Sequence, residues 1–290
     1  MKDKYWIFAA LLILNPHNSL YAENQDEAPR YWETAVPNPR GVVVVAHGLN
    51  VKPSKMGTPL AEGTLVKLLI DSGFHVYRVA LKGHYGSIAD MQDITQSDWM
   101  RDAYSQYLQA KTFAESAGTP LYLLGFSLGA LVYELLMNEE TPVPVRFEKA
   151  ILFSPAAAIK PVAKAVLWLQ PFTGVKSIIR SASPKEYRAQ TGASIAAYKA
   201  VFAMEKSLRS ASFRNCNINT IIFIDKNDEI VSARMLRKMI NQYGLTNWKI
   251  HEITNLGAVI KPKRHHLLID CECVSAATWL YISKTILDLF

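Results

Sequence analysis

Ser127 is the residue whose surroundings point most directly to chemistry. It lies between Gly125 and Gly129, in the spacing G-x-S-x-G, after the apolar run Leu121–Leu124 and before the helix-compatible residues 130–137. This order of strand, sharp turn and helix is typical of a nucleophile elbow, which presents a serine hydroxyl at the apex of a tight turn. Glycine two positions before and two positions after the serine avoids a steric clash where the backbones of the strand and the helix approach each other. The segment therefore predicts a nucleophilic serine at position 127.

The chain offers two carboxylates and two imidazoles that could activate this serine. A serine hydroxyl is a weak nucleophile unless an imidazole takes its proton and a carboxylate orients the imidazole. Asp225 and Asp228 follow one apolar run, and His265 and His266 precede the last helical segment. The residue types alone leave both choices open.

These candidate residues lie in a chain whose pattern predicts apolar strands alternating with helices. Helices are expected at 58–72, 95–117, 130–137 and 271–289, and strands at 41–46, 74–79, 121–124, 149–154, 219–225 and 248–253, with at most a short edge strand near Tyr31. The alternation predicts an α/β protein whose sheet is mostly parallel and is covered by helices on both faces. Because ligands and reactive groups gather at the carboxyl ends of parallel strands, we expect one site there, formed by His47, Ser127, Asp225, Asp228 and the loop around His265.

A helical pattern interrupts the alternation between Pro155 and about Asn215. We interpret residues 156–212 as a helical cap, inserted into a core made of residues 23–155 and 213–290. The apolar residues from Ile159 to Leu167 follow helical spacing. Their face either packs the cap onto the core or also lines a pocket for an acyl chain, and the cap is a candidate for transient contact with a membrane surface.

The N-terminus differs in composition from the rest. Lys2 and Lys4 precede the apolar run Tyr5–Leu14, and polar residues and Ala22 follow it. This pattern is typical of a secretory signal peptide over residues 1–22, and the apolar run is about half the roughly 20 residues that span a bilayer. We therefore expect an exported protein, periplasmic or secreted after cleavage near Ala22.

The composition excludes some function classes. The chain has 290 residues, 50% of them hydrophobic, and its net charge of +7 is spread without a basic run, which argues against a nucleic-acid partner. Cys216, Cys271 and Cys273 are an odd number for an oxidising compartment and lack zinc-site spacing, so we expect at least one free thiol and no metal. The expected strand directions place Cys216 far from the other two, which argues against a disulfide.

The order of the motifs resembles the α/β-hydrolase superfamily. His47-Gly48 comes first, then Gly83-His84-x-Gly-Ser, then the serine motif, and a late acid and histidine close the series. Residues 40–290 look most like the lysophospholipase and monoacylglycerol-lipase group, which is also described as serine aminopeptidase-like. The resemblance implies the α/β-hydrolase fold, with about six to eight strands, a short or missing opening hairpin and no cofactor.

The resemblance also chooses among the paired candidates and implies Ser127 as the nucleophile. The family's acid loop has the form G-x-x-D-x-x-V, which matches Asp228 rather than Asp225. Its base usually stands five residues before an acidic residue, as in H-x-[LI]-x-x-[DE], which matches His265 rather than His266. The implied triad is therefore Ser127, Asp228 and His265.

Acyl transfer also needs donors for the developing oxyanion. The backbone N–H of Leu128, at the start of the elbow helix, is one candidate, and the resemblance implies that Leu49, after the first strong strand, supplies the other. His47 and His84 are expected to support loops rather than to react.

The resulting hypothesis is an exported serine hydrolase that cleaves carboxylic esters, of lipid or lysophospholipid type, through an acyl-serine intermediate. A thioesterase or an aminopeptidase could use the same triad, and the chain could also be a non-catalytic binding protein on a hydrolase fold. The expected partner is a small-molecule or lipid ester, and the sequence indicates no obligate protein partner.

Overall fold

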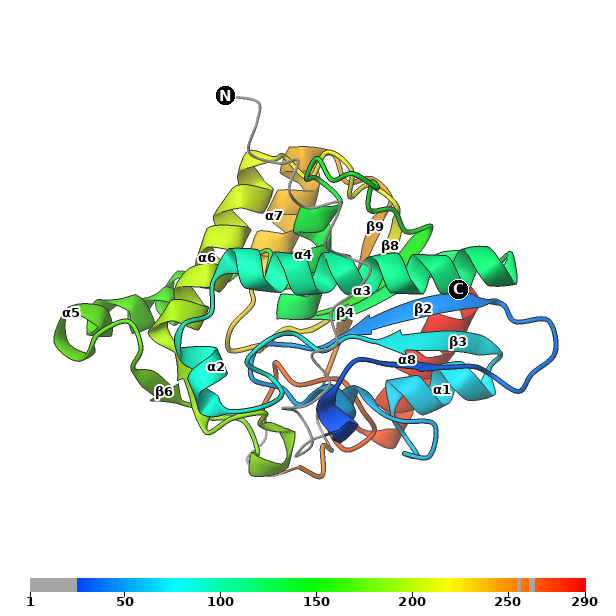
Figure 1. Ribbon diagram of the computed structural model, residues 1–290, viewed down its shortest axis with the longest axis horizontal. Coiled ribbons are helices and arrows are strands. Elements are labelled where there is room, and N and C mark those ends of the chain that lie inside the picture. The colour runs from blue at the N-terminus through cyan, green and yellow to red at the C-terminus, as the bar shows by residue number, and fades with distance from the viewer. Residues whose placement is uncertain (1–24, 255–256, 261–263) are drawn as a thin grey trace, which may run out of the picture.

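The computed structural model describes residues 25–254, 257–260 and 264–290, and its centre is a seven-stranded sheet (Figure 1). The strands lie in the order β1-β3-β2-β4-β5-β8-β9, and every neighbouring pair is parallel except β1 with β3. Their bounds are β1 Arg30–Trp32, β2 Gly41–Ala46, β3 Phe74–Arg78, β4 Leu121–Phe126, β5 Lys149–Phe153, β8 Asn219–Asp225 and β9 Trp248–Ile253. The predicted α/β class and mostly parallel sheet are confirmed. The predicted signal peptide lies outside the described residues.

The central strands are apolar throughout because helices cover both faces of the sheet. Along β2, Val42 and Val44 pack into one buried cluster, and Val43 and Val45 pack into a second cluster on the opposite face. The parallel register aligns Ala46 with Gly125, so β2 and β4 end at the same edge of the sheet. The loops that follow these strands therefore meet at one rim.

Two groups of helices cover the faces (Figure 1). Residues of α2, α3, α4, α6 and α7 belong to the buried cluster of Val42, and residues of α1 and α8 belong to that of Val43. The bounds are α1 Leu65–Asp71, α2 Ile88–Gln92, α3 Gln96–Ala117, α4 Leu128–Leu136, α6 Ile195–Ser210, α7 Ala233–Tyr243 and α8 Ala276–Leu289. Short 3-10 helices cover Gln25–Glu27 (η1), Pro53–Met56 (η2) and Lys185–Tyr187 (η4).

Two predicted helices start later than expected. The segment 58–64 forms turns before α1, and Gly63 has a φ of +69° with its Cα so close to Cys271 that a Cβ would lie 2.1 Å from that thiol. The closing helix α8 starts after Ser275, whose side chain accepts a hydrogen bond from the N–H of Thr278, and not at Cys271. The three cysteines are free thiols.

The insert between β5 and β8 contains strands as well as helices. It comprises η3 (Pro161–Leu169), α5 (Gln170–Thr173), β6 (Ile178–Arg180), β7 (Gly192–Ser194) and α6. The antiparallel pair β6–β7 departs from the all-helical prediction, because strands this short leave no usable periodicity in the sequence. Gly192 permits the pairing, since a Cβ there would lie 2.1 Å from the carbonyl oxygen of Ile179. Figure 1 shows α5 and β6 projecting from the body of the molecule.

Glu134 is a buried acid in the last turn of α4. It is fully buried, and its carboxylate oxygens have no hydrogen-bond partner among the described residues. Burial raises the pKa of Glu134 from its ordinary 4.5 to about 8. The folded protein therefore holds this proton more tightly than the unfolded chain does.

Replacing Glu134 by Gln tests this burial. Between about pH 4.5 and pH 8 the folded state binds a proton at Glu134 that the unfolded state has released, so this residue makes the wild type less stable as the pH rises. Glu134→Gln removes that dependence. The free energies of unfolding from urea titrations at pH 5 and pH 8 should therefore shift in favour of the variant by at least about 1 kcal/mol over this range. A difference between the two proteins that is the same at both pH values would contradict the prediction.

Candidate active site

Ser127 occupies the turn between β4 and α4 in a backbone conformation that few non-glycine residues adopt. Its φ is +50° and its ψ is −108°. A Cβ at Gly125 would lie 2.7 Å from the Cα of Ala130, and a Cβ at Gly129 would lie 2.6 Å from the carbonyl of Ala46. These contacts are the physical reason for the G-x-S-x-G spacing, and they place the serine side chain at the rim where the strands end.

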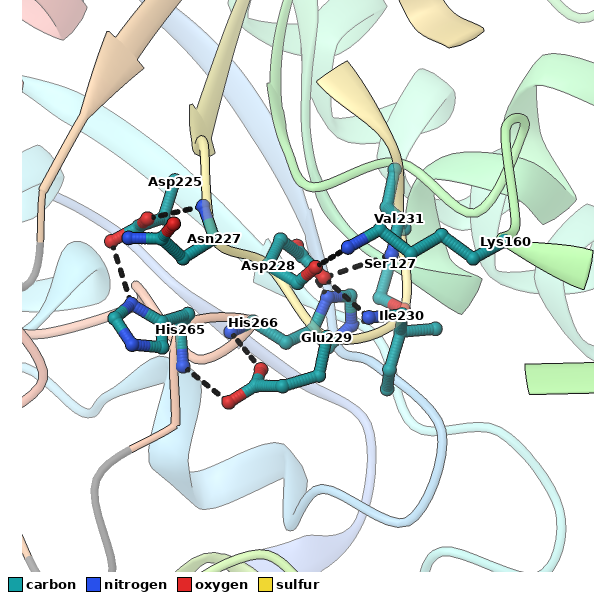
Figure 2. A network of polar contacts seen from close by, with 10 residues as sticks. All are labelled: Ser127, Lys160, Asp225, Asn227, Asp228, Glu229, Ile230, Val231, His265 and His266. Atoms are coloured by element: carbon teal, nitrogen blue, oxygen red, sulfur yellow. Dashed lines mark hydrogen bonds and ion pairs between the residues drawn. The ribbon is translucent and has the colours of Figure 1, made fainter. Parts of the chain in front are cut away.

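A chain of two hydrogen bonds links Ser127 to an aspartate through His266. The Nε2 atom of His266 lies 2.9 Å from the Oγ of Ser127, and its Nδ1 lies 2.8 Å from Oδ2 of Asp228. Figure 2 shows the imidazole between the serine and the aspartate. The serine comes from the β4–α4 turn, the aspartate from the loop after β8 and the histidine from the loop before α8, in the spatial arrangement of a Ser-His-Asp triad.

The prediction that His265 would reach Ser127 is wrong. Its Nδ1 lies 3.0 Å from Oδ2 of the fully buried Asp225, on the side of the loop away from the serine (Figure 2). Asp270, the acidic residue that made His265 fit the family pattern, accepts a hydrogen bond of 2.7 Å from the hydroxyl of Tyr187 instead. The spacing to that acid therefore carries no information about which histidine faces the serine.

Asp228 is held in the orientation that its bond to His266 needs. Its Oδ1 accepts hydrogen bonds from the N–H groups of Ile230 and Val231, at 2.7 and 2.8 Å. Burial by itself raises the pKa of Asp228, but the charge and hydrogen bond of His266 and the two amide bonds outweigh it, so the pKa lies below its usual value. The residue is therefore an ionised acceptor, as the orienting member of a triad must be.

Glu229 fixes the backbone of both histidines, a role that the sequence reading missed. Its Oε1 accepts from the N–H of His265 at 3.0 Å, and its Oε2 accepts from the N–H of His266 at 2.9 Å. The loop after β8 therefore orients the loop that carries the two histidines in two ways (Figure 2). Asp228 bonds to the ring of His266, and Glu229 bonds to the backbone N–H groups of His265 and His266. The one feature of the sequence that could have indicated this role is that Glu229 directly follows Asp228.

The predicted oxyanion residues Leu49 and Leu128 lie beside Ser127 in the lining of one cavity. The N–H of Leu128 belongs to the first turn of α4, whose N–H groups lack partners within the helix. The N–H of Leu49 shares a peptide unit with the carbonyl of Gly48, and that oxygen accepts from the N–H of Val51 at 3.2 Å. Because the N–H and C=O of a trans peptide point in opposite directions, this bond fixes the direction of the Leu49 N–H.

His47 and His84 support this loop, as the sequence indicated. The Nε2 of His47 accepts from the N–H of Leu81 at 3.1 Å, so its Nδ1 carries the proton that is shared with the carbonyl of Gly48 at 3.0 Å. The Nε2 of His84 accepts from the N–H of Asn50 at 2.9 Å. Burial lowers the pKa of His84 to about 4 and holds that of His47 well below its ordinary value. Both rings are neutral hydrogen-bonding supports at neutral pH.

The cavity beside Ser127 has a volume of about 360 Å³ and two kinds of lining. Cap residues supply an apolar part that includes Ala163, Val166, Tyr198, Val201 and Phe202. The other part contains the polar residues Arg180, Ser181, Ser183, Glu229 and Arg264. The apolar cap face that the sequence singled out thus lines the cavity in part.

Two further findings bear on function. Within residues 25–254, 257–260 and 264–290, no group of three or more His, Cys, Asp and Glu side chains is placed to hold a metal ion. In the same described part of the chain, no helix has the length and apolar character needed to cross a membrane.

Solved structures with the same fold include three lipolytic enzymes. The monoglyceride lipase from Saccharomyces cerevisiae, in complex with a substrate analog, has a TM-score of 0.69 and 13% identity over 90% of this chain and 89% of its own. A metagenome-derived lipolytic enzyme of the LipS and LipT study has a TM-score of 0.67 and 18% identity over 91% and 97%. The monoacylglycerol lipase from Paleococcus ferrophilus has a TM-score of 0.64 and 18% identity over 90% and 96%. At these identities the likeness establishes the fold.

No curated protein matches the chain, but the sequence does match a protein family. Residues 37–271 match the family described as "Serine aminopeptidase, S33". This range contains the serine turn, the acid loop and both histidines, and the fold agrees with that of α/β-hydrolases. The chain therefore belongs to the serine aminopeptidase S33 family of serine hydrolases.

Proposed function

We propose that the protein cleaves carboxylic esters through an acyl-Ser127 intermediate. The observation that carries the proposal is the pair of hydrogen bonds from Ser127 through His266 to the buried Asp228, at 2.9 and 2.8 Å. This arrangement lets an imidazole take the serine proton while a carboxylate stabilises the imidazolium that forms.

We assign one group to each step of the proposed reaction. His266 Nε2 accepts the proton of Ser127, and the serine oxygen attacks the ester carbonyl carbon. The N–H groups of Leu49 and Leu128 donate hydrogen bonds to the negatively charged carbonyl oxygen. The tetrahedral intermediate then expels the alcohol, which takes the proton from His266. A water molecule, deprotonated by the same histidine, then attacks the acyl carbon. The bond from that carbon to the serine oxygen breaks, the oxygen takes the proton back from His266, and the acid leaves.

The cavity lining favours a lipid ester over the other candidates. An aminopeptidase needs a carboxylate to bind the ammonium group of its substrate, and the acidic residue of the described cavity lining is Glu229. Both carboxylate oxygens of Glu229 already accept hydrogen bonds from the backbone of the histidine loop. The apolar cap lining suits an acyl chain, and the three lipolytic enzymes of the same fold support the same substrate class. A thioester presents the same acyl group and is the second candidate.

Export is part of the proposal and rests on the sequence of residues 1–22, with its lysines, short apolar run and Ala22. Intact-mass measurement of the protein recovered from its native compartment tests it. An N-terminus that still includes Met1 or the apolar run would contradict export with cleavage near Ala22.

Replacing Ser127 by Ala tests the nucleophile. The variant should lose at least about 1,000-fold in kcat on p-nitrophenyl butyrate, because no other group can form the acyl intermediate. Wild type should also be labelled by a fluorophosphonate, and Ser127→Ala should not. Turnover of medium- and long-chain p-nitrophenyl esters as well would favour a lipid-ester hydrolase over an esterase for short acyl chains. Labelling that persists in the variant would contradict the mechanism.

The neighbouring histidines provide a matched pair of variants. His266→Ala should lower kcat by at least about 1,000-fold, because it removes the proton acceptor of Ser127. His265→Ala removes the hydrogen bond to Asp225 and leaves the bonds of Ser127, His266 and Asp228 in place, so it should change kcat by less than about tenfold. The measurement is kcat on one soluble ester for both variants. The reverse ranking would restore His265 as the base.

We also propose that the cap contacts a lipid surface. Large apolar side chains at its projecting end are exposed to solvent: Val162 at 73%, Trp168 at 78% and Phe172 at 86%, with Leu169 and Val175 less so. Residues 154–185 contain no acidic residue. Lys164 and Lys176 pair with Glu205 and Asp93, and Arg180 and Lys185 are exposed basic residues of this segment. Exposed aromatic residues within a basic segment fit a membrane surface that carries anionic lipids.

A double substitution at the cap tests this contact. Trp168→Ser with Phe172→Ser should lower partitioning onto vesicles of phosphatidylcholine with phosphatidylglycerol by about tenfold or more, because it removes the apolar groups that enter the interface. The matched control is Leu280→Ser, at a site on α8 that is 71% exposed, which should bind as the wild type does. Turnover of p-nitrophenyl butyrate checks that the active site is intact. Unchanged vesicle binding in the double variant would contradict the proposal.

A further inference from the structure

Asn50 connects the oxyanion loop to the cap. It follows Leu49 directly, its side chain is almost fully buried, and its φ is +55°. Together with Leu49 it forms the centre of the turn that the bond from Val51 N–H to the carbonyl of Gly48 closes. Turns with a positive φ at the third residue favour glycine or asparagine there. The turn alone would therefore be served by either residue, and the asparagine side chain needs a separate explanation.

The side chain of Asn50 pairs with the backbone of Gln190 at both ends of its amide. Its Nδ2 donates to the carbonyl of Gln190 at 3.1 Å, and its Oδ1 accepts from the N–H of Gln190 at 2.8 Å. The backbone adds two bonds: the carbonyl of Asn50 accepts from the N–H of Ala189 at 3.1 Å, and its N–H donates to His84 at 2.9 Å. Every backbone and side-chain polar group of Asn50 is thus engaged.

The segment that Asn50 holds belongs to the cap. Residues 187–190 lead into β7, and the β7 residue Ala193 lines the cavity beside Ser127. The same segment is bonded to the core at Tyr187, whose carbonyl accepts from the N–H of Lys52 at 2.9 Å and whose buried hydroxyl donates to Asp270. The oxyanion loop and this arm of the cap are therefore one hydrogen-bonded unit.

We propose that Asn50 is a positioning residue for the oxyanion hole, which ties the direction of the Leu49 N–H to the seating of the cap segment 187–190. The inference rests on the proposed function. Gly48 carries the carbonyl of the same peptide unit as the Leu49 N–H, so a change in the turn rotates that N–H away from the reacting carbonyl. An oxyanion donor stabilises charge that exists only in the transition state and the intermediate. A misdirected donor therefore lowers kcat and leaves substrate binding nearly unchanged.

The variant Asn50→Gly isolates the side chain, because glycine keeps the positive φ without strain. On p-nitrophenyl butyrate its kcat should fall by about tenfold or more, with KM within about twofold of wild type. The inhibition constant of a trifluoromethyl ketone, which forms a tetrahedral oxyanion on the serine, should rise by a similar factor. Asn50→Asp keeps the acceptor but loses the donor to the carbonyl of Gln190, and it should lower kcat in the same direction.

The matched control is Asn38→Gly, the same substitution at another asparagine with a positive φ, whose side chain is exposed. It should keep the kcat of the wild type. Thermal unfolding of each variant shows whether the protein is folded at the assay temperature. A folded Asn50→Gly with wild-type kcat and inhibitor affinity would overturn the inference, as would a folded Asn50→Asp with wild-type kcat. Absence of turnover in the wild type would instead refute the proposed function.

Discussion

The site depends on one strained turn that its neighbours hold in place. A non-glycine residue at a φ of +50° costs roughly 1–3 kcal/mol and persists only where surrounding contacts over-determine it. At Ser127 these contacts are the bond from its N–H to the carbonyl of Phe153 and the bonds that its own carbonyl accepts from Leu131 and Ala156. They come from β5, from α4 and from the chain that leaves β5. The serine is thus fixed jointly by the sheet, by the helix that follows it and by the segment after β5.

The charges of the titratable groups around the turn are set by burial together with their hydrogen-bond partners. His47 and His84 lie behind the oxyanion loop, and their burial keeps both neutral, so they can accept hydrogen bonds from backbone N–H groups. Asp228 is equally buried but receives two amide bonds and faces His266, so it stays ionised. Three buried titratable groups therefore differ in charge because their hydrogen-bond partners differ.

Elements and site residues could be predicted from the sequence where a local pattern of residue types is typical of one structure. The β-branched run Val42–Val45 is typical of a strand covered on both faces, and Gly125 and Gly129 mark close backbone contacts, so the class of fold and the position of Ser127 could be predicted. The choice between His265 and His266 could not, because adjacent residues in a loop point in different directions and the direction is set by Glu229 and Asp228, far away in the chain. The pair β6–β7 was missed for the same reason: it depends on contacts across the cap and not on local pattern.

The cap is attached to the core at two places, each beside a different part of the site. At its start, Lys160 donates from its backbone to Ile230 and from its side chain to the carbonyl of Asp228, and Ile159 forms a bridge with Val231. Near its middle, before β7 and α6, residues 187–190 join the oxyanion loop. The insert is therefore not an exchangeable module. A cap taken from a relative would have to form both sets of contacts with the core. Substrate preference can therefore change more readily through substitutions within β6, η3 and α6 than through replacement of the whole cap.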